Sequence, residues 1–336
     1  MAIVNKYGYK INNKTILNLK NDSHTNLSKK DVATQKSYYS TSLVIDSIYK
    51  NINIMQLSET EIHDFNLTGQ AANTVRTEYK SFINRFQQLL ENEENKNLFF
   101  NGQIYGMHSL LFGTLFTSFI FEIIILAVLI TAYLINYEFD NDTQLLVYST
   151  KRGRSLVKDK LWVAVFSTIA TTTIIIGTGL VTYFTAFNYK GLWNVPISSY
   201  FNADHNLPYI SKWNMTFSQY LFCSVILIYI LALIFIGIAF LISAFVKNSY
   251  LSFCVFAIVF ATTLLLPSFM PKNSNAIFIF HLTPFILSMN STWWFMLCNA
   301  FNTFKYYELI IVLVWTIIAA SLDIGSIKRF NKIDIN

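Results

Sequence analysis

The charged residues that could do chemistry are concentrated in one stretch, residues 138–160. It begins with acidic residues, continues through a short apolar segment that contains Leu145, Leu146 and Tyr148, and ends with basic residues. In order, the charges are Glu138, Asp140, Asp142, Lys151, Arg152, Arg154, Lys158, Asp159 and Lys160. Opposite charges on the two sides of a short apolar helix can orient it in a partner's groove. The pattern predicts one of two functions. The segment either docks in this way, or its basic residues simply anchor it on the cytoplasmic side of the membrane, after acidic residues that are exposed to water.

Motifs for covalent or metal-assisted catalysis are missing from the sequence. It has no phosphate-cradling glycine loop with Lys, no HExxH, no nucleophile elbow and no paired Cys motif. The five histidines are far apart, and Cys223, Cys254 and Cys298 lie in or beside apolar stretches, which is typical of small buried side chains. We therefore expect no metal and no cofactor. We also expect that the chain is not an enzyme and that it does not hydrolyse ATP itself.

Composition indicates an integral membrane protein. Of 336 residues, 53% are hydrophobic and only 13% are charged, and the chain has 30 Phe and 19 Tyr. Soluble domains usually carry about 25% charged residues. The charge is also uneven, because 12 of the 25 Lys and Arg lie in residues 1–106, which contain no apolar run long enough to span a bilayer. The net charge of +6 is diluted, so we expect no nucleic-acid partner.

The apolar part, residues 107–336, predicts an all-α membrane domain with five spans. A spanning helix needs about 20 mainly apolar residues. The segments that qualify are roughly 109–136, 161–186, 220–245, 250–270 and 308–327. Glu122 is the one ionisable residue well inside a span. Because a lipid-exposed acid is costly, Glu122 should line a transport pathway or lie at an interface, bonded to a neighbouring hydroxyl.

The distribution of Lys and Arg in short loops predicts the orientation. If residues 137–160 are cytoplasmic, nine basic residues share that side and four lie opposite. The nine are Lys151, Arg152, Arg154, Lys158, Lys160, Lys247, Lys328, Arg329 and Lys332, and the four are Lys190, Lys212, Lys272 and Lys305. This orientation predicts a cytoplasmic C-terminus and an extracytoplasmic segment 1–106.

An extracytoplasmic segment 1–106 has no signal that would translocate it. The simplest explanation is a first transmembrane helix missing from the start of this sequence; unaided translocation or a different topology are the alternatives. Within the segment, Ala71–Glu94 and about Ser40–Leu57 predict amphipathic helices, whereas residues 1–35 are rich in Asn and Lys and are expected to be loosely ordered.

Two further apolar stretches, Ala276–Ser288 and Thr292–Phe304, are too short to span. Segments of this length suit re-entrant or interfacial helices. We expect a re-entrant pair at about 276–304, with Trp293 and Trp294 at headgroup depth.

The stretch 138–160 resembles the first cytoplasmic loop of ABC-2 type transporter permeases. The similarity lies in an acid, a Leu-Leu-x-x-Ser-Thr segment, a Lys-Arg-Gly-Arg turn and a Lys before the next helix. By this resemblance, Glu138 matches the family's acid, 145–150 its coupling helix, Arg154 its basic turn and Lys160 its Lys. Leu145, Leu146 and Tyr148 would form an apolar knob, oriented by Glu138 on one side and by Arg152 and Arg154 on the other.

The resemblance covers about 107–336 and implies partners as well as a fold. The expected partners are a separate ABC ATPase subunit, a second permease subunit and the lipid bilayer, in the cell membrane of a bacterium. The expected function is export of a peptide, bacteriocin or drug-like substrate. Family members have six spans and a cytoplasmic N-terminal segment, whereas this sequence shows five spans and no such segment. The alternative is a non-transporting immunity or receptor-like membrane protein whose outer helical region binds a ligand.

Overall fold

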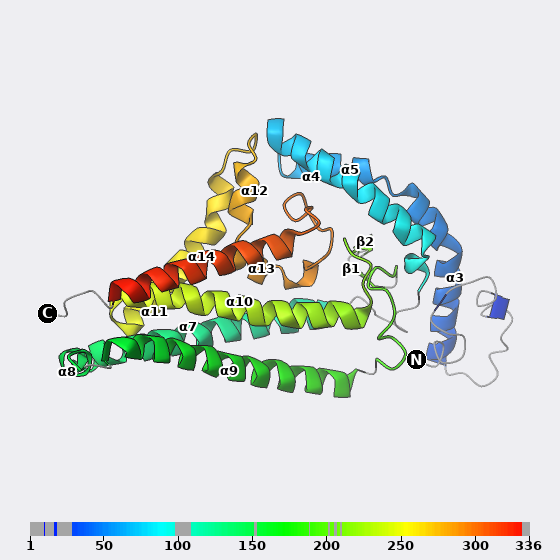
Figure 1. Ribbon diagram of the computed structural model, residues 1–336. Coiled ribbons are helices and arrows are strands. Elements are labelled where there is room, and N and C mark those ends of the chain that lie inside the picture. Colours follow the sequence, from blue (N-terminus) through cyan, green and yellow to red (C-terminus); the bar gives the residue numbers. More distant parts are fainter. Residues whose placement is uncertain are drawn as a thin grey trace.

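The structure is a computed structural model that describes residues 10, 17–18, 29–97, 109–150, 153–187, 189–200, 202–204, 207–208 and 210–330. Five helices are long and apolar enough to cross a membrane, and they lie roughly side by side (Figure 1). They are η3–α7 (Ser109–Leu115 and Phe116–Asp140), α9 (Leu156–Ala186), α10 (Phe217–Val246), α11–η5 (Ser249–Leu265 and Leu266–Phe269) and α14 (Tyr307–Phe330). The chain is therefore a multi-pass, all-α integral membrane protein, as its composition predicted.

Local sequence sets the ends of these helices. Thr216 and Gln219 form a capping box at the start of α10. Lys247 ends α10 in the left-handed conformation, with φ 54°, and the Asn248 side chain then accepts a hydrogen bond from the Leu251 N–H to begin α11. Only Lys247 and Asn248 therefore separate α10 from α11.

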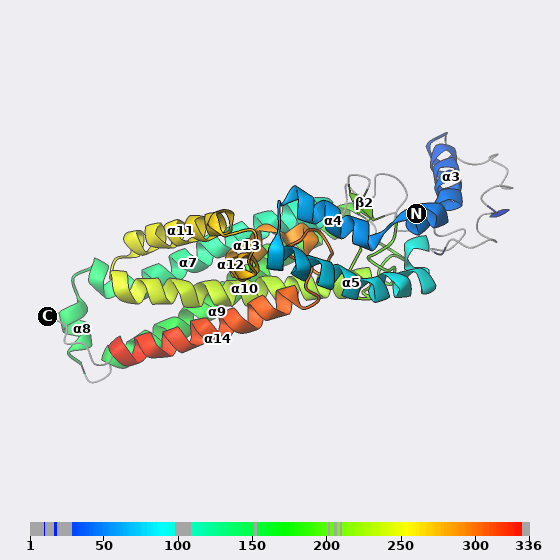
Figure 2. The same cartoon turned by 90° about the horizontal axis from the view of Figure 1, so that it is seen from above.

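Helix α10 lies at the centre of the bundle. It packs against α7, α9, α11 and α14, and Figure 2 shows α11 and α14 on either side of it. Small residues allow close approach at two crossings. A Cβ at Gly237 would lie 3.0 Å from the Ala319 Cβ, and a Cβ at Gly179 would lie 2.1 Å from Phe119 Cζ. Both glycines therefore let neighbouring helices pack closely.

Three helices form a cap over one end of the bundle. These are α3 (Lys29–Asn51), α4 (Ile54–Asp64) and α5 (Gly69–Glu91), followed by the 3-10 turn η2 (Glu94–Lys96). Helix α5 matches the amphipathic helix predicted from Ala71. The single helix predicted from about Ser40 is instead two helices, because the Asn53 side chain accepts hydrogen bonds from the next turn and caps α4.

The cap is fixed to the loops of the bundle by backbone and ionic contacts. At its α4–α5 corner, the Thr68 N–H donates to Lys272 O at 2.9 Å, and Gly69, with φ +52°, lets the cap lie against Asn273. At its other end, Arg85 forms a buried, two-pronged ion pair with Glu94 and also donates to the Trp213 carbonyl at 3.1 Å. Cap and bundle also share one continuous apolar core.

The described residues between the spans at the cap end form short elements. They are β1 (Ala203–Asp204) paired antiparallel with β2 (Leu207–Pro208), then α12 (Ala276–His281), α13 (Pro284–Met289) and η6 (Ser291–Trp293). The predicted pair of helices at 276–304 is therefore wrong in detail. Pro284 begins a new helix within the first stretch, and beyond Trp293 the second stretch is an irregular loop, with Trp294 1% exposed and Phe295 at φ 59°.

Candidate partner-docking site at the free end of the bundle

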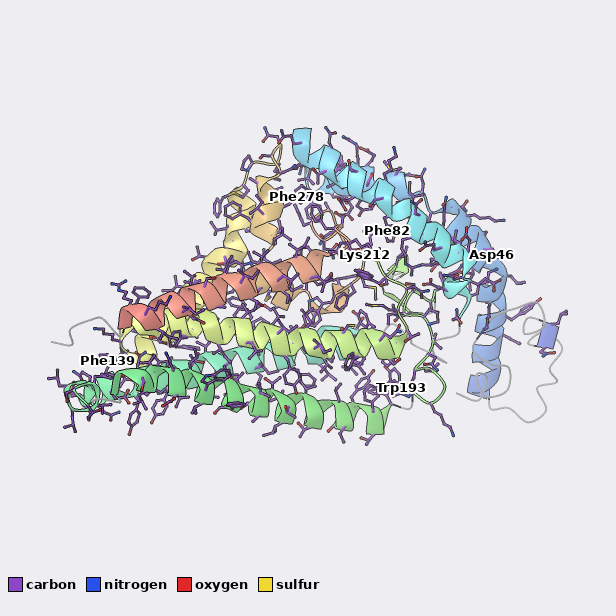
Figure 3. All side chains as sticks on the ribbon, in the orientation of Figure 1. Asp46, Phe82, Phe139, Trp193, Lys212 and Phe278 are labelled. Carbon is purple, nitrogen blue, oxygen red and sulfur yellow. The ribbon has the colours of Figure 1, made fainter. Side chains whose placement is uncertain are left out.

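The end of the bundle opposite the cap contains the stretch that the sequence analysis singled out. Helix α7 ends there at Asp140, and the chain turns through the short helix α8 (Gln144–Tyr148) and the 3-10 turn η4 (Gly153–Ser155) into α9. The α10–α11 turn and the last turn of α14 lie at the same end, which we call the α8 end (Figure 1). Phe139 marks it in Figure 3, far from Trp193 and Lys212 at the cap end.

A buried ionic network fixes α8 to the two spans that flank it. The Glu138 carboxylate, at the end of α7, accepts hydrogen bonds through Oε2 from the Tyr148 hydroxyl, at 3.1 Å, and from Lys160 Nζ at the start of α9. The three residues are only 5%, 3% and 8% exposed, respectively. Burial and the adjacent Glu138 charge raise the pKa of Tyr148, so its hydroxyl stays a donor.

Apolar packing supports the same network. Tyr148 forms a cluster with Ile135 of α7, Val157 of α9 and Phe240 of α10. The centroids of the Phe139 and Tyr148 rings lie 5.8 Å apart. Lys247 Nζ lies over the Phe139 ring, 5.3 Å from its centroid. Three spans therefore hold the position of α8.

Gly153 allows the loop to fold closely against α8. A Cβ at this position would lie 1.9 Å from the carbonyl oxygen of Val147 and 2.8 Å from the Tyr148 Cα. Since these are backbone atoms, a side chain at residue 153 would displace α8 or the turn. The glycine in the predicted basic turn thus has a steric function.

The opposite face of α8 is apolar and exposed. Leu145 is 57% exposed and Leu146 is 74% exposed, although both lie beside a well-packed cluster. Because α8 lies beyond the ends of the spans, these two side chains project from a rigid support at the end of the bundle. Such a pair of exposed leucines is the arrangement that a groove on a partner protein would cover.

Asp140, the last residue of α7, joins that helix to the α10–α11 turn. It accepts hydrogen bonds from Asn248 Nδ2, at 3.2 Å, and from the Ser249 N–H and hydroxyl. These contacts place a carboxylate at the N-terminus of α11, where the helix dipole favours negative charge. The α7–α8 corner and the α10–α11 turn are therefore connected.

The structure brings together some of the predicted docking residues and corrects the function of others. Leu145 and Leu146, which were predicted to form an apolar knob together with Tyr148, are both exposed. Tyr148 is not part of an apolar knob, because it faces inward, and Glu138 and Lys160 support α8 instead of presenting charge to a partner. Arg152 and the side chain of Arg154 lie outside the described residues.

Glu122 lies on an exposed face of α7. At 1.5 Å per residue it is about 20 Å from the Ser109 end and about 27 Å from the Asp140 end of the first span, which is close to mid-span. Ile125, Leu129 and Tyr133 are 44%, 42% and 56% exposed on the same helix. Glu122 has no hydrogen-bond partner among the described residues, and these residues leave it exposed.

Another buried ion pair, which the sequence did not indicate, joins two segments at the cap end. Lys212 Nζ lies 3.4 Å from Glu308 Oε1 and donates to Asn302 O at 2.8 Å. The Phe295 N–H donates to the same Glu308 oxygen at 2.7 Å. Burial lowers the pKa of Lys212, and the Glu308 charge opposes that shift. In the sequence, Lys212 was counted only among the basic residues of the loops. Its pairing with Glu308, 96 residues later, leaves no local sequence pattern that could have predicted it.

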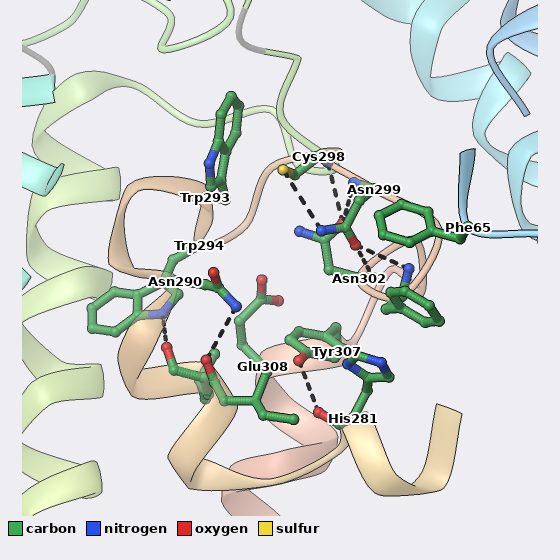
Figure 4. A pocket seen from close by; sticks show the side chains of 13 residues that line it. Phe65, His281, Asn290, Trp293, Trp294, Cys298, Asn299, Asn302, Tyr307 and Glu308 are labelled. Atoms are coloured by element: carbon green, nitrogen blue, oxygen red, sulfur yellow. Dashed lines mark hydrogen bonds between the residues drawn. The ribbon is translucent and has the colours of Figure 1, made fainter. Parts of the chain in front are cut away.

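A cavity of about 200 Å³ lies next to Glu308. Figure 4 shows its lining, in which the Tyr307 hydroxyl donates to His281 O at 3.0 Å and Trp294 Nε1 donates to Leu287 O at 2.8 Å. The His281 ring stacks on the Phe301 ring, with 3.8 Å between the ring centroids. Burial lowers the pKa of His281 to about 4. Within the described ranges, no group of three or more His, Cys, Asp or Glu could hold a metal ion.

Comparison with known proteins identifies no relative: no protein-family model, no curated protein and no solved structure matches the chain.

Proposed function

We propose that this chain is the membrane-spanning subunit of an ABC-2 type exporter and that α8 docks into a separate ATPase subunit. The observation that carries the proposal is the exposed pair Leu145 and Leu146 on a short helix at the end of the bundle. Beneath it, Glu138 connects α8 to two spans. A helix that must transmit movement needs an exposed contact face and a rigid attachment, and α8 has both.

The attachment also indicates how movement would be transmitted. An ATPase that closes on ATP would displace α8, and the Glu138–Tyr148–Lys160 network would pass that displacement to the end of α7 and the start of α9 together. The contacts of Asp140 with Ser249 would extend it to α11. Three of the five spans would then respond to one contact on α8.

The proposed location is a bacterial cell membrane, with the α8 end and the C-terminus in the cytoplasm and the cap outside. The arrangement of basic residues supports this orientation. Lys158, Lys247, Lys328 and Arg329 lie at the α8 end, whereas Lys190, Lys272 and Lys305 lie at the cap end. Lys and Arg in short loops favour the cytoplasmic side.

The face of α7 that contains Glu122 supports a second permease subunit. A carboxylate near mid-span and outside the packed interior must be covered by protein or by water, because exposure to lipid costs about 2.5–3.5 kcal/mol on insertion scales. A second subunit packed against this face would cover Glu122 with protein, and a pathway between the two subunits would give it access to water. The substrate class we propose is a peptide, bacteriocin or drug-like molecule.

The proposal is tested by affinity purification of the tagged chain from its native membranes. The wild-type chain should co-purify with an ATPase subunit and with vanadate-sensitive ATP hydrolysis. The Leu146→Asp variant should lose both, because docking would bury a charge where a leucine had been. The control is Leu43→Asp, which changes another exposed leucine, 57% exposed, on α3 of the cap. Equal recovery of ATPase with both variants would contradict the proposal.

A second candidate function is favoured by a different observation. The cap and the loops beneath it line a partly open cavity of about 400 Å³, which suits a ligand-binding protein of the immunity or receptor type that transports nothing. Ligand binding without any co-purifying ATPase would favour this alternative.

A further inference from the structure

The cavity beneath the cap has a mixed lining, in which apolar walls from several parts of the chain are joined by the uncharged polar side chains of Asn51, Asn53, Gln56 and Thr60. Ile52 and Leu57 lie at the α3–α4 junction and on α4, Tyr79 lies on α5, and Trp293 and Leu297 lie on the segment that leads into α14. Its volume of about 400 Å³ falls within the usual range for small-molecule sites. The cavity therefore has the size and the lining to hold an organic ligand.

Glu61 is the sole charged side chain among the described residues that line this cavity. Its Oε2 accepts a hydrogen bond from the Ala300 N–H at 3.0 Å, whereas its Oε1 has no partner in the described part of the chain. Burial raises the pKa of Glu61, and no Lys or Arg in the described ranges lies within ion-pair distance of it. Glu59, two residues earlier, is instead paired with Arg76 on the outside of the cap.

This arrangement lacks only a positive charge. A partly desolvated carboxylate without a cation favours a ligand that brings one. The aromatic faces of Tyr79 and Trp293 also attract cations, and the apolar walls would cover a hydrocarbon or aromatic body.

We infer that the cavity binds a small organic monocation, in which an ammonium group is joined to an apolar body, with Glu61 as its counter-ion. Such a ligand contacts the cap through Glu61 and the segment before α14 through Trp293. The inference depends on the cavity alone and not on the docking of an ATPase to α8, which lies at the opposite end of the bundle. It therefore stands or fails separately from the proposed function.

The test uses the full chain in phosphatidylcholine nanodiscs, with saturation-transfer NMR titrations of tryptamine and tryptophol. These probes have the same indole body and differ in an ammonium or a hydroxyl group. Tryptamine should bind the wild-type protein at least tenfold more tightly than tryptophol, after subtraction of the signal from empty nanodiscs. Equal affinity for the two probes, or binding to empty nanodiscs alone, would overturn the inference.

Two variants and one control locate the site. Glu61→Gln retains an acceptor for the Ala300 N–H and should lower the affinity for tryptamine at least tenfold, with little change for tryptophol. Leu297→Trp retains Glu61 but fills the cavity, so it should weaken both probes. Glu59→Gln should change neither. Undiminished binding of tryptamine to Glu61→Gln and to Leu297→Trp would place the ligand elsewhere and refute the inference.

Discussion

Removal of Lys160 tests the anchor of α8 most sharply. In Lys160→Met, Glu138 keeps the hydrogen bond from the Tyr148 hydroxyl but loses its counter-ion, although it remains 5% exposed. Breaking a buried pair by removing one partner costs about 3–5 kcal/mol, because the remaining charge is uncompensated. We therefore expect the free energy of unfolding to fall by about that amount.

A second substitution separates the charge from the packing. In the double variant Glu138→Gln with Lys160→Met, no charge is buried and the glutamine oxygen still accepts from Tyr148. Because a neutral replacement of a buried pair is often nearly neutral in stability, most of the lost stability should return. In Tyr148→Phe, the loss of one hydrogen bond to a charged group should cost about 1.5–3 kcal/mol.

The assay is equilibrium unfolding in mixed micelles of increasing SDS fraction, followed by circular dichroism. Arg76→Met, which removes the exposed ion pair with Glu59 in the cap, is the control and should unfold like the wild-type protein. A Lys160→Met variant within about 1 kcal/mol of wild type would refute the argument that a buried pair anchors α8.

The other predictions concern packing, pH and transport. Gly179→Ala should lower the free energy of unfolding by about 1–3 kcal/mol, because the new Cβ would overlap the Phe119 ring. Gly177→Ala is the control and should leave stability unchanged, because no atom lies within 4 Å of its Cβ. Equal unfolding of the two variants in SDS would argue against the crossing described for α7 and α9. His281 binds a proton more weakly in the folded state, with a pKa of about 4 against 6.5, so stability should be complete above pH 6.5 and fall by up to about 3 kcal/mol towards pH 4. His281→Gln should flatten that dependence in thermal unfolding, and an unchanged slope would contradict it. If Glu122 lines a pathway between two subunits, Glu122→Gln should reduce transport in a vesicle assay without loss of ATPase binding, whereas wild-type transport would remove Glu122 from the mechanism.

The spans could be predicted because their signal is local and long. Each is a run of apolar residues longer than a bilayer needs, and the helices found differ from the predictions mainly by one more turn at their ends. The start of α9 at Leu156 illustrates why the helices extend beyond the predicted spans. Polar residues such as Lys160 can be part of the helix because Glu138 neutralises the charge of Lys160. Composition alone places such residues outside a span.

The features that could not be predicted depend on tertiary contacts. The apolar stretch Thr292–Phe304 has no helical period that would distinguish it from a loop, and its conformation depends on Trp294 burial and on the bond from the Phe295 N–H to Glu308. The inward direction of Tyr148 likewise depends on a carboxylate ten residues earlier. The same charges flank Leu145, Leu146 and Tyr148, so they could not distinguish the two exposed leucines from the buried tyrosine.

Site-specific crosslinking in native membranes tests whether α8 contacts an ATPase subunit through Leu146. Cys223, Cys254 and Cys298 are first replaced by serine or alanine, and a single cysteine is then introduced at position 146 or, as a control, at position 43. A short thiol-reactive photocrosslinker at position 146 should yield one adduct with a nucleotide-binding ATPase subunit, and the same reagent at position 43 should yield none. The absence of an ATPase adduct at 146, in membranes where that ATPase is present, would contradict the proposed contact.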